Sequence, residues 1–102
     1  MPKPPTRREA IAELAERFQR NGYVRIQNHE RLHEVGYQLY KKGYEVRLTA
    51  HSEEELHRIQ GLLRALGFTV ARPFAKAHHF RQPIYGREQV RNFLLLIGYS
   101  AG

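Results

Sequence analysis

The stretch that decides the fold is residues 44–68, YEVRLTAHSEEELHRIQGLLRALGF. Its first part, residues 44–50, alternates apolar and polar side chains, which is the period of a half-buried strand. Ser52 and Glu55 then fit a capping box, and leucines and an isoleucine recur at helical spacing after it. Gly67 stands where a left-handed residue would end that helix. The stretch therefore predicts a strand followed by an amphipathic helix that packs on one face of a sheet.

Similar signals lie on both sides of this unit. Each predicted helix ends at a glycine that precedes an aromatic residue, and each such glycine is expected to be left-handed. Pro83 cannot donate a ladder hydrogen bond, so its strand is expected at a sheet edge. Residues 29–42 fit a helix, which we favour, or one half of a hairpin. The other predicted helices span residues 6–22 and 87–97, and the other predicted strands span residues 23–27, 68–72 and 79–85.

These elements predict an α+β fold, with three or four helices packed on a small mixed sheet. From residue 44 onward the order β-α-β-β-α is that of a ferredoxin-like unit. The chain of 102 residues suits a single domain, here residues 6–102 after a flexible tail of residues 1–5. Cysteine is absent, and the longest apolar run is residues 93–97, far short of a membrane span. We expect a cytoplasmic protein without disulfides and without a membrane partner.

Charge is the most informative bulk property. The formal net charge is +7, and residues 56–102 contain seven Lys and Arg but only one Glu. Guanidinium groups bind phosphate in bidentate fashion, and a positive surface attracts polyanions. Our leading hypothesis is a non-enzymatic, cofactor-free protein that binds DNA or RNA through residues 72–91. We expect the cations and histidines to contact phosphates, and Tyr85 or Phe80 to stack on an unpaired base. The predicted binding residues are Arg47, Arg72, Lys76, His78, His79, Arg81, Tyr85, Arg87 and Arg91.

A second hypothesis comes from the run Gly67-Phe68, Arg72 and His78-His79-Phe80. It resembles part of the HicA-type mRNA interferase toxins, in which a histidine on a strand cleaves RNA on a small double-stranded-RNA-binding-like fold. The resemblance implies that His78 is the catalytic residue. An imidazole suits general acid–base work on a ribose hydroxyl.

Two further hypotheses remain open. His29-Glu-Arg-Leu-His33 is a literal H-E-x-x-H, so His29 and His33 could bind zinc with Glu30 as general base of a peptidase. The position of a third metzincin ligand holds Leu39, however, which cannot bind a metal. Alternatively, an edge strand and exposed aromatic residues could make the protein a homodimer or a partner-binding module.

Overall fold

A computed structural model describes residues 3–26 and 43–99. The described helices are α1 (Arg7–Asn21), α3 (Glu53–Ala65) and α4 (Arg87–Leu96), and the described strands are β1 (Tyr23–Arg25), β2 (Glu45–Ala50), β3 (Phe74–Lys76) and β4 (His79–Tyr85). The strands form one sheet in the order β1-β2-β4-β3. The α+β class and the β-α-β-β-α order from β2 onward are confirmed. All three strand pairings are antiparallel, so the described sheet is not mixed.

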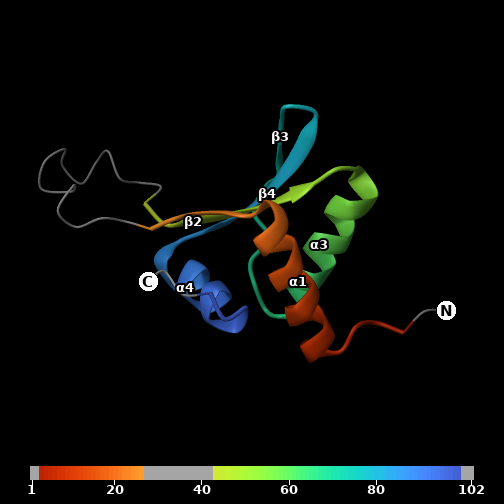
Figure 1. The fold of residues 1–102 in the computed structure, drawn as a ribbon, viewed down its shortest axis with the longest axis vertical. Coiled ribbons are helices and arrows are strands. Elements are labelled where there is room, and N and C mark those ends of the chain that lie inside the picture. The colour runs from red at the N-terminus through yellow and green to blue at the C-terminus, as the bar shows by residue number, and fades with distance from the viewer. Residues whose placement is uncertain (1–2, 27–42, 100–102) are drawn as a thin grey trace, which may run out of the picture.

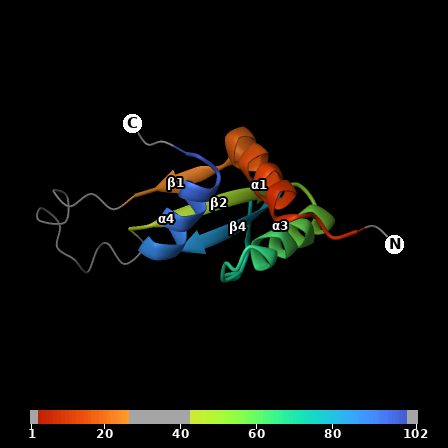
Figure 2. The same cartoon turned by 90° about the horizontal axis from the view of Figure 1, so that it is seen from below.

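The three described helices cover one face of the sheet. Figure 1 shows the sheet close to edge-on with α1, α3 and α4 below it, and Figure 2 shows the same layer turned by 90°. Residues of β2, β4 and every described helix are fully buried in one apolar cluster, which includes Leu14, Leu48, Ile59, Ile84 and Phe93. The helix layer therefore fixes which side chains of each strand face away from the core.

The helix starts follow the capping signals in the sequence. The Thr6 hydroxyl accepts a hydrogen bond from the Glu9 amide at 3.1 Å, and the Glu9 carboxylate accepts one from the Thr6 amide at 2.9 Å. The Ser52 hydroxyl caps α3 by accepting from the Glu55 amide at 3.1 Å. These three amides would otherwise be unpaired at the helix starts, so the caps set where each helix begins.

At the ends of the three described helices, the glycine prediction holds with one exception. Gly67 and Gly98 have φ of +86° and +73°, as expected for left-handed residues that end α3 and α4. Gly22 has φ of −79°, so the prediction of a left-handed residue there is wrong. The chain passes directly from α1 into the extended backbone of β1. Glycine is still required, because a Cβ at this position would overlap the Phe18 side chain and carbonyl.

The predicted strand over residues 68–72 is wrong. Residues 68–73 form no ladder, and the strand begins later, at Phe74. A buried side chain holds this segment instead: the Gln82 amide donates to the Ala71 carbonyl at 2.8 Å and accepts from Gln60 of α3 at 2.9 Å. Side-chain hydrogen bonds to Gln82 of β4 and to Gln89 of α4 replace the backbone ladder that the apolar pattern suggested.

The prediction that residues 79–85 form an edge strand is also wrong, because β4 lies between β2 and β3. However, β3 pairs only with His79, Phe80 and Arg81 of β4. Pro83 lies beyond the end of β3, where β2 is the one strand neighbour within the described residues. The missing N–H of Pro83 is therefore tolerated inside a central strand, since the ladder has already stopped on one side.

The uncertain segment of residues 29–42, with the H-E-x-x-H sequence, lies outside the described residues. Across residues 3–26 and 43–99, no group of three or more His, Cys, Asp or Glu side chains could hold a metal ion. No helix in these two ranges combines the length and the apolar character needed to cross a membrane.

Candidate nucleic-acid interface

The candidate site is the sheet face that the helices leave uncovered. Val46, Leu48 and Ala50 point into the core, so the alternate residues of β2 point away from it. Strand register places Tyr23 and Pro83 beside Arg47 on this face. We name it the open face, and it comprises Tyr23, Arg25, Glu45, Arg47, Thr49, Phe74, Lys76, His79, Arg81, Pro83 and Tyr85.

Arg47 occupies the centre of the open face. Its guanidinium carbon lies 5.3 Å from the centroid of the Tyr23 ring and 5.2 Å from that of Phe74, within cation–π range. Its Nε donates to one Glu45 carboxylate oxygen at 2.5 Å and its Nη2 to the other at 3.3 Å. The side chain of Glu45 is 1% exposed and that of Arg47 is 23% exposed. The fold thus holds this arginine between two rings and over a buried carboxylate.

A cationic concavity opens next to Arg47, with a volume of about 410 Å³. β3 and the start of β4 rise from the sheet on the side away from the helices, as Figure 1 shows. Arg81 contributes a buried Nη1 that has no hydrogen-bond partner within the described part of the chain. Four of the lining residues are cations and none is a carboxylate. The lining residues are Asn21, Tyr23, Arg25, Arg47, Thr49, Lys76 and Arg81.

Negative charge collects on the other side of the molecule. Among the described glutamates, all except Glu45 belong to the three helices. Glu13 of α1 accepts hydrogen bonds from Arg17 and from Arg58 of α3, and the Arg58 bond is the main cause that lowers the pKa of the Glu13 carboxyl. Arg17 also binds Glu55 at 2.7 Å. Several cations of the helix layer are therefore neutralised locally, and the open face has one carboxylate against four Arg and Lys.

The structure divides the predicted binding residues between separate surfaces. Five of them lie on the open face: Arg47, Lys76, His79, Arg81 and Tyr85. Arg72 is exposed in the segment between α3 and β3. Arg87 and Arg91 belong to α4, on the helix side of the sheet. The expected single surface over residues 72–91 is thus only partly formed.

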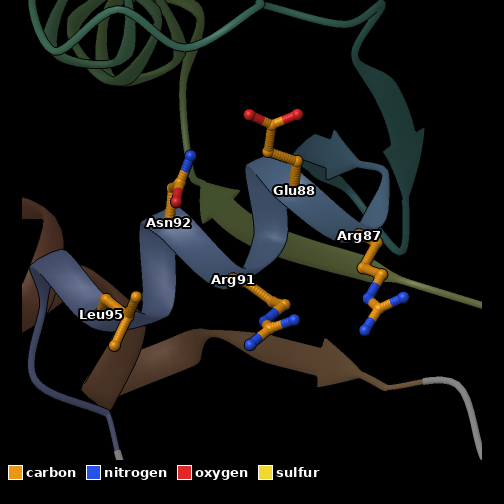
Figure 3. A pocket seen from close by; sticks show the side chains of 5 residues that line it. All are labelled: Arg87, Glu88, Arg91, Asn92 and Leu95. Carbon is orange, nitrogen blue, oxygen red and sulfur yellow. The ribbon is translucent and has the colours of Figure 1, made fainter.

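The α4 arginines line a second, smaller hollow of about 350 Å³. In Figure 3 Arg87 and Arg91 extend toward the same side of the helix, and Glu88 and Asn92 extend away from them. Leu95, which is 76% exposed, completes the lining of this hollow. Since this hollow includes a carboxylate and an apolar side chain, it suits phosphate less well than the concavity of the open face.

His78 does not occupy the position that the HicA-type resemblance implies. The resemblance expects a histidine on a strand, but His78 is exposed in the two-residue turn between β3 and β4. Its φ is +68° and that of Ala77 is +51°. Both central residues of the turn are left-handed, as a type I′ hairpin turn requires. The local geometry of His78 is thus set by the turn.

Sequence reasoning missed part of the concavity, namely Asn21, Tyr23, Arg25 and Thr49. Their alternation with core residues was visible in the sequence, because Tyr23 and Arg25 flank Val24. Which of them meet across the sheet depends on strand register, which the sequence left open. No known protein family matches this chain, and neither does any curated protein or solved structure.

Proposed function

We propose that this is a cytoplasmic, non-enzymatic nucleic-acid-binding protein, and that its open face is the binding surface. The observation that carries the proposal is the convergence of Arg25, Arg47, Lys76 and Arg81 on one concavity with no carboxylate among its lining residues. These four positive charges repel one another, and a bound phosphate group would reduce that repulsion.

Phosphate also fits the hydrogen-bonding capacity of the concavity. Guanidinium donors form paired, charge-assisted bonds to phosphate oxygens. The buried Nη1 of Arg81 is a donor without a partner within the described residues, and an unpaired buried donor costs about 1–3 kcal/mol. Arg81 also lines the concavity, and a small movement of its side chain toward a phosphate there would give this donor an acceptor.

A polymer suits the open face better than a small anion does, because exposed aromatic residues adjoin the cations. Tyr23 is 45% exposed and Tyr85 is 41% exposed. Bases of a nucleic acid stack on such rings without regard to their sequence, and phosphate contacts carry no sequence information. We therefore expect binding that tolerates many sequences.

Fluorescence anisotropy with labelled oligonucleotides tests this proposal. For four phosphate contacts the slope of log K against log salt is about −2.8 for a single strand and about −3.6 for a duplex, so affinity falls about 50- to 150-fold between about 50 and 200 mM salt. Single-stranded RNA, single-stranded DNA and a duplex are titrated in parallel. Absence of binding at the lower salt, or equal affinity at both salts, would contradict the proposal.

A further inference from the structure

We propose that His51 and His79 form a two-imidazole site for a divalent transition-metal ion. The proposal does not depend on nucleic-acid binding. His51 directly follows β2, and His79 is the first residue of β4, the strand that pairs with β2. The register pairs their chain neighbours Ala50 and Phe80. Two adjacent strands thus present the two imidazoles side by side at one end of the sheet.

The distance between the two rings matches the spacing of two ligands on one metal ion. The two Nδ1 atoms are 3.2 Å apart, and the ring centroids are 4.3 Å apart with an angle of 79° between the planes. For bonds of about 2.0–2.1 Å, two nitrogens on one ion are about 2.9 Å apart at a right angle and about 3.3 Å apart at the tetrahedral angle. The observed spacing falls between these values, so the two nitrogens already lie as far apart as two ligands of one ion, and the rings need to turn so that both lone pairs point at it.

The ligand set defines the class of metal. Imidazole nitrogen favours Cu²⁺, Ni²⁺ and Zn²⁺, with Cu²⁺ the tightest, whereas Mg²⁺ and Ca²⁺ prefer oxygen. Lys76 pairs with His79 in the strand register and opposes any cation electrostatically. His51 is exposed, so water can occupy the remaining coordination positions.

Metal binding rearranges one proton in the neutral pair. Without metal, one Nδ1–H donates to the Nδ1 of the other ring, so one ring nitrogen carries the hydrogen that the metal would displace. On binding, that proton moves to Nε2 of the same ring, and both Nδ1 lone pairs become ligands. The net charge of the two imidazoles does not change.

Isothermal titration calorimetry of the whole chain with Cu²⁺, and separately with Ni²⁺, tests the site. Both histidines bind the same metal ion, and the second ligand adds affinity because the first already holds the ion beside it. His51→Ala and His79→Ala should therefore each weaken metal binding about 100-fold. Both side chains are outside the apolar core, and a thermal melt of each variant checks that the fold is retained. His57→Ala, which removes an exposed histidine of α3, should leave affinity unchanged.

The second histidine pair of the sequence, His29 and His33, provides the decisive comparison. A variant lacking both should keep the chelate, with affinity that still depends on His51 and His79. The proposal is overturned if His51→Ala and His79→Ala bind Cu²⁺ as the parent does. It is equally overturned if removal of His29 and His33 abolishes all binding.

Discussion

Substitution of Arg47 by methionine should destabilise the fold by a large fraction of its total stability. The Glu45 carboxylate is 1% exposed, and both of its oxygens accept hydrogen bonds from Arg47. Methionine keeps the apolar contact with the neighbouring rings but leaves a buried carboxylate without its cation. Breaking a buried pair in this way costs about 3–5 kcal/mol, from a typical domain stability of about 5–15 kcal/mol.

A double-mutant cycle separates the pair from other effects of the substitution. Glu45→Gln removes the charge and leaves Arg47 partly hydrated at 23% exposure, so its cost should be smaller, about 1–3 kcal/mol. The double variant Glu45→Gln/Arg47→Met should recover most of the stability lost in Arg47→Met, because no buried charge remains. Urea unfolding followed by far-ultraviolet circular dichroism measures all four proteins.

If Arg47→Met lowers the free energy of unfolding by less than about 1 kcal/mol, the reasoning is refuted, because a solvent-exposed ion pair contributes no more than that. Equal stability of Arg47→Met and the double variant would refute it as well. The expected result also has a practical consequence. Arg47 supports the fold, so loss of nucleic-acid binding in an Arg47 variant would not by itself identify a contact.

Three further variants test separate features of the fold. Ala77→Asn/His78→Gly should raise the free energy of unfolding by about 1 kcal/mol in urea titrations, because both residues have positive φ and Asn-Gly suits a type I′ turn. Gly61→Ala should raise it by about 0.5–1 kcal/mol, since a Cβ at this exposed position of α3 meets nothing within 4 Å. A melting temperature below that of the parent protein would contradict either expectation. Arg58→Gln should lower stability at neutral pH but not in acid: Arg58 lowers the pKa of Glu13 from 4.5, so its contribution is present above that value and is lost as pH falls through the lowered pKa. A stability difference between parent and Arg58→Gln that does not change with pH would contradict this linkage.

Local signals predicted the helices well. The capping hydroxyls of Thr6 and Ser52 mark where α1 and α3 begin, because the cap, the first turn and its donors are adjacent in the chain. The strand of residues 45–50 was equally clear from alternation. These features depend on contacts a few residues apart, which the sequence displays directly.

Features that depend on contacts across the sheet were predicted less well. Pro83 suggested an edge strand, and only the short length of β3 explains its central position. The pattern of residues 68–72 suggests a strand, but Gln82 binds that segment through its side chain. In the candidate site, the sequence grouped Arg87 and Arg91 with Arg81, and the sheet separates them because α4 crosses to the helix side.

The claim that the open face binds nucleic acid is tested most directly by two variants with equal loss of charge. Lys76→Gln/Arg81→Gln removes two cations from the concavity, and Arg87→Gln/Arg91→Gln removes two from α4. The measurement is the slope of log K against log salt for single-stranded RNA, for both variants and the parent. The first variant should reduce the slope by about 1.4 and weaken binding by at least about tenfold, and the second should leave the slope within about 0.3 of the parent. A larger loss of slope in the α4 variant than in the open-face variant would contradict the account.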